Sequence, residues 1–202
     1  MWVDDMADAN TCTALFVIDI QGELANDPAT QIPHADRVVQ AGTNILQSAR
    51  RAIADNNNAN DDKTPSIIVF VQHEETDGGL VRGSEAWKLV FPPQSGVKTE
   101  ILVSKTTRDT FESNRDLAQR LRDLNIGHIM AFGIQSECCV LSTCGGALAA
   151  GFGVTLLSGA HSTYDVGGKT AVEVESEVEA ELKAKGAHNV PWEDVVKTWE
   201  KI

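Results

Sequence analysis

The sequence lacks the features that mark membrane proteins and nucleic-acid-binding proteins. No stretch approaches the ~20 consecutive apolar residues that a membrane-spanning helix needs. Lys and Arg number 17 against 29 Asp and Glu, which gives a net charge of −12. Nucleic acids and anionic membranes attract clustered positive charge, so we expect neither as a partner. A solvated surface is the simplest explanation of the acidic surplus.

The four cysteines do not form the pattern of a disulfide-rich or zinc-binding protein. They stand at positions 12, 138, 139 and 144, two of them are adjacent, and no CxxC pair occurs. The first ten residues carry Asp4, Asp5 and Asp8 and lack the basic start and apolar core of a signal peptide. We therefore expect a cytoplasmic protein in which residues 1–11 form a tail and residues 12–202 form a single domain.

Short apolar runs alternate with amphipathic segments along the chain. Five runs predict buried strands, at residues 14–19, 67–71, 101–103, 129–132 and 154–157. Helices are expected at about 34–54, 114–124 and 136–150. Residues 168–185 fit either a strand or a helix, and we expect a helix because a crossover is due there and Glu, Ala and Lys favour it. The segment near Val195 fits a short strand or a helix. The alternation predicts a three-layer α/β/α fold.

Polar residues stand where the predicted strands end. Asp19 closes the first strand, His73 follows the second and Lys105 follows the third. The segment 133–139 follows the fourth. Ligands of parallel sheets bind at the carboxyl ends of the strands, so we expect these groups to converge there. The connections 74–93 and 106–113 are expected to determine substrate specificity.

Cys139, Asp19 and Lys105 have the chemistry of a nucleophile, a base and a fixed cation. Cys139 lies in the first turn of its predicted helix, where the helix dipole and Lys105 are expected to lower its thiol pKa. Asp19 could accept the thiol proton and later activate water. Each residue alone has an ordinary explanation: a buried thiol, a loop cap or a surface charge. The three together indicate a catalytic site.

Four segments resemble the isochorismatase-like cysteine hydrolase superfamily. They are Phe16-Val17-Ile18-Asp19-Ile20-Gln21, Phe70-Val71-Gln72-His73-Glu74, Val103-Ser104-Lys105 and Gly133-Ile134-Gln135-Ser136-Glu137-Cys138-Cys139-Val140. The resemblance covers about residues 12–165. It implies a Rossmann-like fold with a mainly parallel, about six-stranded sheet, and assembly into dimers or larger homo-oligomers.

The resemblance also implies a reaction. Asp19, Lys105 and Cys139 would be the catalytic triad of an enzyme that cleaves a small amide, ureido or related C–N bond through a covalent acyl-thiol intermediate. Family members tend to carry a cis peptide, here Ile134–Gln135, which would direct the backbone N–H groups of Gln135 and Cys139 at the oxyanion. No cofactor is expected. Vinyl-ether hydrolysis of the isochorismate type and a catalytically silent interaction protein are the alternatives.

Other candidate residues rest on weaker patterns. Cys138 competes with Cys139, but the family register, in which the cysteine directly precedes valine, selects Cys139. His73 is a candidate substrate contact, with a satisfied strand-end histidine as the alternative. Trp87 and Phe111 are candidate pocket walls, with packing in the core or in a subunit interface as the alternative. The nicotinamidase branch holds a metal with an Asp and two His, whereas residues 55–66 contain no His, so we expect no metal.

Overall fold

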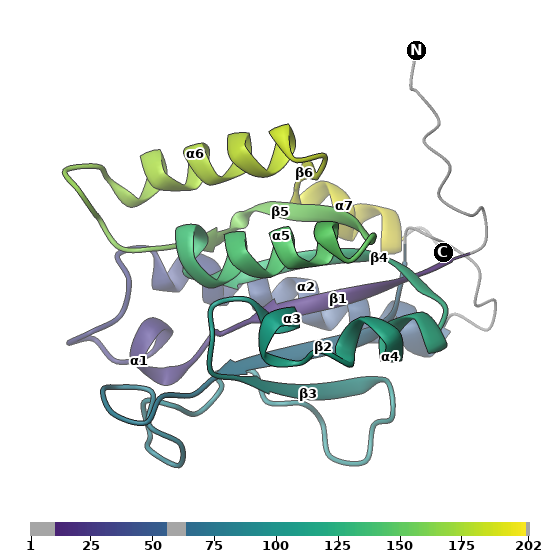
Figure 1. Ribbon diagram of the computed structural model, residues 1–202, viewed down its shortest axis with the longest axis horizontal. Helices are drawn as coiled ribbons and strands as arrows, with labels where there is room; N and C mark the ends of the chain where they lie inside the picture. Colours follow the sequence, from purple (N-terminus) through teal and green to yellow (C-terminus); the bar gives the residue numbers. More distant parts are fainter. Residues whose placement is uncertain (1–10, 56–63, 201–202) are drawn as a thin grey trace.

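One six-stranded sheet organises the molecule, whose computed structural model describes residues 11–55 and 64–200. The strand order is β3-β2-β1-β4-β5-β6, and every pairing is parallel. The strands are β1 (Cys12–Ile18), β2 (Pro65–His73), β3 (Glu100–Lys105), β4 (Ile126–Ile134), β5 (Gly153–Ser162) and β6 (His188–Pro191) (Figure 1). The five predicted strands correspond to β1 to β5, and the predicted α/β/α fold with a parallel sheet is confirmed.

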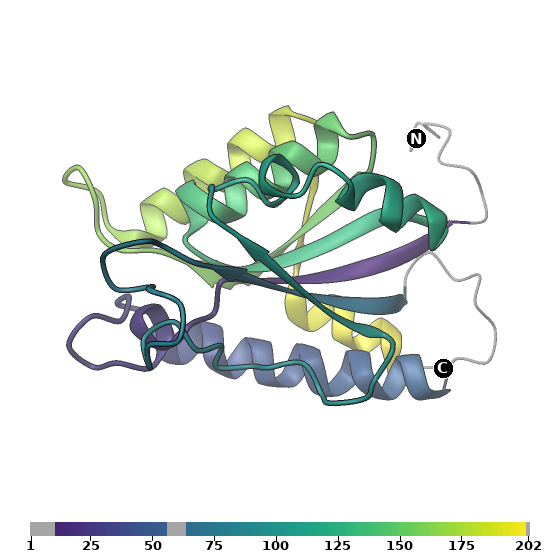
Figure 2. The same ribbon diagram turned by 60° about the horizontal axis from the view of Figure 1, so that its bottom comes forward.

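Helices cover both faces of the sheet and close two separate apolar cores. The helical elements are α1 (Gly22–Ala25), α2 (Ala35–Asp55), α3 (Thr110–Ser113), α4 (Leu117–Asp123), the π-helical turn η1 (Ser136–Val140), α5 (Leu141–Ala149), α6 (Ala171–Ala184) and α7 (Trp192–Trp199). Helices α2 and α7 pack on one face, and α4, α5 and α6 pack on the other (Figure 2). Because both faces are covered, the central strands are mainly apolar, and all seven residues of β1 are buried.

The structure refines the sequence-based expectation in three segments. The helix expected at 114–124 is shorter, because Asn114 ends α3 with a non-helical backbone before α4 begins. The ambiguous segment 168–185 contains helix α6, which Thr170 starts by accepting a hydrogen bond from the Glu173 N–H in a capping box. Val195 lies in α7. Residues 1–10 of the expected tail and 56–62 of the Asn-rich segment are outside the described residues.

The carboxyl ends of the strands meet at one edge of the sheet. Ile18, His73, Lys105 and Ile134 end β1, β2, β3 and β4, so the residues beside them share that edge. In the described part of the chain, no helix has the length and apolarity needed to cross a membrane.

Candidate active site

The Lys105 ammonium lies at the centre of the site. Its Nζ is 2.7 Å from Asp19 Oδ2 and 3.1 Å from Cys139 Sγ. It also lies 3.1 Å from His73 Nδ1 and 3.1 Å from the Thr107 carbonyl oxygen. Three strand ends and the turn after a fourth therefore bring the predicted base, cation and nucleophile within contact of one another. The convergence expected from the strand order is present.

The turn that carries the two adjacent cysteines is wider than an ordinary α-helical turn. The Gln135 carbonyl accepts from the Val140 N–H at 3.1 Å, five residues on, which is the π-helical pattern. The Ile134–Gln135 peptide is cis, as the resemblance implied. We call residues 135–140 the nucleophile turn. π-Helical turns occur frequently at functional sites, because they displace side chains from the α-helical register.

Gly133 allows the nucleophile turn to lie against β1. Its φ of +142° is a conformation that L side chains rarely adopt, and a Cβ there would come within 2.0 Å of the Ile18 carbonyl oxygen. Asp19, the next residue of that chain segment, has a φ of +49°, which is uncommon outside glycine. The surrounding structure must hold this conformation, and such strained residues cluster at active sites.

Gln21 ties the site to the loop after β2. Its Nε2 donates to the carbonyls of His73 at 2.9 Å and Trp87 at 2.7 Å, and its Oε1 accepts from the His73 N–H. Gln72 Nε2 also donates to the Trp87 carbonyl, at 2.9 Å. Gln21 is fully buried. The glutamine of the Asp-x-Gln segment therefore positions backbone, while Asp19 faces the cavity.

The structure changes one expectation, the ionisation of Cys139. Burial and then the Asp19 carboxylate raise the pKa of Cys139 to about 12, and Lys105 only partly opposes them. The sequence-based expectation of a lowered pKa counted the helix terminus and the ammonium, but not burial beside a carboxylate. At neutral pH Cys139 is therefore a thiol, and a base must remove its proton for it to attack.

Lys105 and His73, the two nitrogen groups beside the thiol, differ in charge. Burial alone lowers the pKa of Lys105, but the ion pair with Asp19 and the contact with Cys139 raise it above its ordinary value. Burial, and then the charge of Lys105, lowers the pKa of His73. Lys105 is thus held as an ammonium and His73 as a neutral imidazole at pH 7. The side chains of Asp19 and Lys105 are 1% and 0% exposed, so water does not screen their interaction.

Asp19, His73 and Cys139 offer three ligand atoms within 4.8 Å of one another, the arrangement of a possible metal site. The Lys105 Nζ already lies 2.7 Å from Asp19 Oδ2 and 3.1 Å from both His73 Nδ1 and Cys139 Sγ. A divalent cation bound by this set would face an ammonium at nearly the same place, with strong repulsion at low dielectric. The donor set therefore does not fit a metal, and the ammonium supplies the positive charge.

A cavity of about 300 Å³ opens over the thiol. Among the predicted residues, its lining includes Asp19, His73, Cys139 and Gln135. Cys138 also lines it, and its pKa is raised by burial and by the nearby Glu137. The remaining lining residues are Glu23, Leu24, Glu75, Leu80, Arg108, Ile134 and Tyr164. Glu75, Leu80 and Arg108 come from the two loops expected to set specificity, whereas the sequence-based prediction missed Glu23 and Tyr164.

Glu23 and Tyr164 follow the ends of β1 and β5, so position after a strand was the available signal. Burial and the charges of Glu75 and Asp27 raise the pKa of Glu23. The two carboxylates and Arg108 give the cavity charges of both signs.

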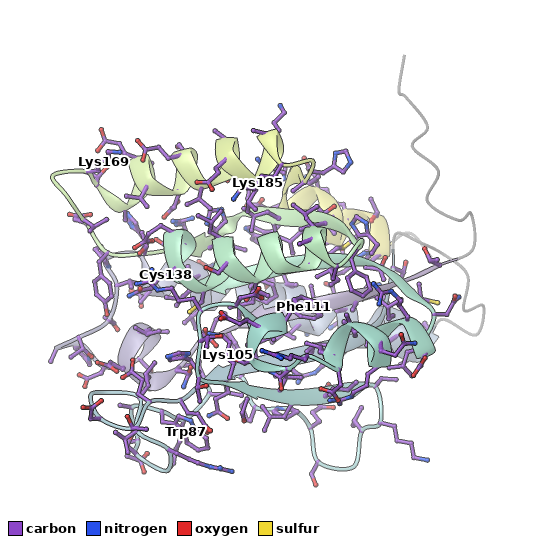
Figure 3. The ribbon with its side chains drawn as sticks, in the orientation of Figure 1. Trp87, Lys105, Phe111, Cys138, Lys169 and Lys185 are labelled. Carbon is purple, nitrogen blue, oxygen red and sulfur yellow. The ribbon has the colours of Figure 1, made fainter. Side chains whose placement is uncertain are left out.

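Trp87 and Phe111, the predicted pocket walls, are not in the lining of this cavity. Phe111 stacks on Phe16, with ring centroids 6.1 Å apart, and contacts Phe152 at 5.9 Å. It packs against the core beneath α5. Trp87 contributes its backbone carbonyl to the Gln21 contacts, and Figure 3 places it in the loop below the sheet edge, away from Cys138. Phe111 therefore packs against the core, whereas Trp87 contacts Gln21 through its backbone carbonyl.

Comparisons with known proteins identify the family of this chain. A family model described as the isochorismatase domain matches residues 13–176. The chain belongs to the isochorismatase family. Two streptothricin hydrolases of Streptomyces noursei are 30% identical over 154 residues and 29% identical over 175 residues. These alignments cover 76% and 86% of this chain but 55% and 57% of the relatives, so the chain spans just over half of their length.

Solved structures of family members share the fold. A cysteine hydrolase from Pseudomonas syringae pv. phaseolicola superposes with a TM-score of 0.77 at 20% identity, covering 97% of this chain and 99% of that one. The pyrazinamidase of Pyrococcus horikoshii, in complex with zinc, gives 0.65 at 22% identity, covering 89% and 98%. At these identities the isochorismatase-family architecture is shared, and the chemistry must be argued from the residues of this chain.

Proposed function

We propose that this protein is a cofactor-independent cysteine hydrolase that cleaves a small amide, ureido or related C–N bond. The observation that carries the proposal is the Lys105 ammonium, in contact with both the Asp19 carboxylate and the Cys139 thiol beside a 300 Å³ cavity. Family membership and the hydrolase names of the two relatives support it. The cavity has the size of a small-molecule site.

In the proposed acylation, the substrate carbonyl carbon is attacked by Cys139 Sγ while Asp19 takes the thiol proton. Asp19 Oδ1 is buried and has no hydrogen-bond partner among residues 11–55 and 64–200, so it is available to accept that proton. The backbone N–H groups of Gln135 and Cys139 would hold the oxyanion. Asp19 then gives the proton to the leaving nitrogen, the C–N bond breaks, and an acyl-thiol remains on Cys139.

In the proposed deacylation, Asp19 takes a proton from water as the water oxygen attacks the acyl carbon. The second tetrahedral intermediate collapses with cleavage of the C–S bond, and Asp19 returns its proton to sulfur. The product is a carboxylic or carbamic acid. Throughout, the Lys105 ammonium opposes the negative charge that moves between the carboxylate, the sulfur and the oxyanion. Its fixed position requires no solvent reorganisation, which is the main source of such stabilisation.

Intact-protein mass spectrometry tests this reaction. The protein is incubated with a panel of small amides, ureas and isochorismate, and the product and any covalent adduct are measured. We expect C–N cleavage of at least one amide or urea, with an acyl adduct that fragmentation assigns to Cys139. Cys139→Ser should abolish turnover. Cys12→Ser is the control, because it makes the same substitution at the start of β1, the end of that strand away from Asp19, and it should leave turnover intact.

Three outcomes would contradict the proposal. An adduct on Cys138 would assign the nucleophile to the neighbouring residue. Turnover of isochorismate alone, without an adduct, would favour vinyl-ether hydrolysis. No turnover of any compound, together with no adduct, would favour an interaction protein on this fold.

The proposed setting is the cytoplasm, with the protein acting as a homo-oligomer on a small-molecule substrate. The family resemblance supports the oligomer, and Leu102 on the edge strand β3 exposes 48% of its surface. Sedimentation velocity measures the assembly directly, and a monomer at micromolar concentration would contradict it.

A further inference from the structure

A second polar chain lies behind the nucleophile turn, outside the cavity. Ser136 Oγ is 2.9 Å from His161 Nδ1, and His161 Nε2 is 3.3 Å from Glu179 Oε1. Ser136 and His161 are fully buried, and the side chain of Glu179 is 29% exposed. The chain joins three elements: η1, the end of β5 and α6.

A shift in the pairing of β5 with β4 makes this contact possible. Ala131 pairs with Leu156, and continuing that register would place Ser158 beside Gly133. Instead, the register shifts and His161 lies beside Gly133. Bulges of this kind re-aim side chains near active sites. The shift places the imidazole next to the residue that follows Gln135.

The carboxylate at one end of the chain favours one order of donors and acceptors. A carboxylate only accepts hydrogen bonds, so His161 Nε2 carries a proton toward Glu179. With a neutral ring, Nδ1 then accepts from the Ser136 hydroxyl. The hydrogen bond from His161 is the main cause that holds the pKa of Glu179 below its usual range. Both ring nitrogens are therefore engaged, which fixes the orientation of the ring.

Helix α6 holds the end of β5 at a second point. Glu175 accepts from the Ser162 hydroxyl and pairs with Arg37 of α2, at 2.6 Å between Arg37 Nη2 and Glu175 Oε1. Glu175 and Glu179 are four residues apart and so lie on the same side of the helix. Figures 1 and 2 both show α6 alongside α5 and β5. His161 and Ser162, at the end of β5, are thus both bonded to α6.

Ser136 is not a second nucleophile, although serine, histidine and glutamate occur here in the order of a hydrolytic triad. Ser136 and His161 are both buried, and none of the three residues lines the cavity. A substrate carbonyl therefore cannot reach the hydroxyl. The chain can act only through the turn that it contacts.

We propose that Ser136, His161 and Glu179 are positioning residues that hold the backbone of the nucleophile turn in its catalytic geometry. The inference rests on the proposed cysteine-hydrolase function, in which the Gln135 and Cys139 N–H groups bind the oxyanion on either side of Ser136. Loss of the Ser136 contact lets this backbone relax away from the oxyanion. Binding of the ground state, made by the cavity walls, is little affected.

Ser136→Ala tests the inference, with Thr155→Val as its matched control. Thr155 Oγ1 makes a similar contact of 2.9 Å with His128 Nε2, between β5 and β4 near the amino ends of these strands. We expect Ser136→Ala to lower kcat on the order of 10- to 100-fold with KM changed less than about three-fold. Amide hydrogen exchange at residues 135–140 should become faster. Thr155→Val should change neither quantity.

His161→Asn separates the role of the ring's two nitrogens. The asparagine amide reaches the place of Nδ1, keeps a contact for Ser136 and loses the contact with Glu179, so kcat should stay within about 5-fold of wild type. Equal effects of Ser136→Ala and Thr155→Val on kcat or on exchange at the turn would overturn the inference. If wild-type protein turns over no amide or urea, the proposed function fails, and hydrogen exchange at the turn still decides the positioning role.

Discussion

Asp19→Asn should separate the ionisation of Cys139 from catalysis. In the folded protein, burial and the Asp19 carboxylate raise the pKa of Cys139 to about 12. The reacting atoms of Asp19 and Cys139 lie within 4.8 Å. At this distance and an effective dielectric constant of about 20, repulsion between a carboxylate and a thiolate is about 3.5 kcal/mol, a factor of a few hundred in the thiolate population.

The variant is therefore expected to have a more reactive nucleophile and a less active enzyme. A thiolate of lower pKa is intrinsically less nucleophilic, with a Brønsted coefficient of about 0.4–0.5, so the rate of alkylation rises only about 20-fold. The Lys105 ammonium, having lost its carboxylate, favours the thiolate further. Hydrolysis should fall by roughly 100- to 10,000-fold, because asparagine cannot accept the thiol proton.

Alkylation by iodoacetamide at pH 8 measures this effect. The modification of Cys139 is followed by peptide mass mapping with fragmentation, which distinguishes it from Cys138. Glu75→Gln is the control, because it removes a carboxylate from the same cavity and leaves the Asp19–Lys105 ion pair in place. The alkylation rate of Cys139 in this variant should stay within about two-fold of wild type. A folded Asp19→Asn protein alkylated no faster than wild type would refute the reasoning, because the carboxylate would then not be what keeps the sulfur protonated.

Three further predictions concern stability, measured as the free energy of unfolding in urea. Lys105→Met should lose roughly 3–5 kcal/mol by leaving a buried carboxylate unpaired, and adding Asp19→Asn should restore most of that loss. Equal losses in the single variant and the double variant would exclude a coupled pair. Phe111→Ala should lose about 2–3 kcal/mol with kcat within three-fold of wild type, and a large loss of kcat would return Phe111 to the site. Burial raises the pKa of Glu100, but the hydrogen bond from Arg50 brings it below 4.5 overall, so this pair stabilises the fold above about pH 4.5 and less as the pH falls. Arg50→Met should therefore destabilise the protein at pH 7 and have little effect at pH 3. A difference in unfolding free energy that stays constant between these pH values would contradict this sign.

Most of the fold could be predicted because it depends on local pattern. Apolar runs long enough for one strand, separated by helical spacing, allow few arrangements besides a covered parallel sheet. Asp19 and Lys105 could be placed at one edge because Asp19 closes one such run and Lys105 follows another after a single serine. The ambiguous segment 168–185 required the additional argument that a crossover was due, and α6 agrees with it.

The candidate site could be predicted only in part. Phe111 and Trp87 are apolar side chains outside the predicted strands and helices, and the same residue types suit a pocket wall and a packed core. Their contacts, with Phe16 for one and Gln21 for the other, depend on elements far away in the chain. Glu23 and Tyr164 reach the cavity from two different strand ends, which no spacing along the sequence connects.

The sequence by itself determined which groups reach the carboxyl edge of the sheet, since strand ends follow from short-range hydrophobic pattern. Only the tertiary structure decided the proton on Cys139 and the partner of Ser136. Electrostatic interactions depend on distances of a few ångströms and on the exclusion of water, and the His161 contact depends on a register shift in β5. Both arise only when segments distant in the chain are packed together.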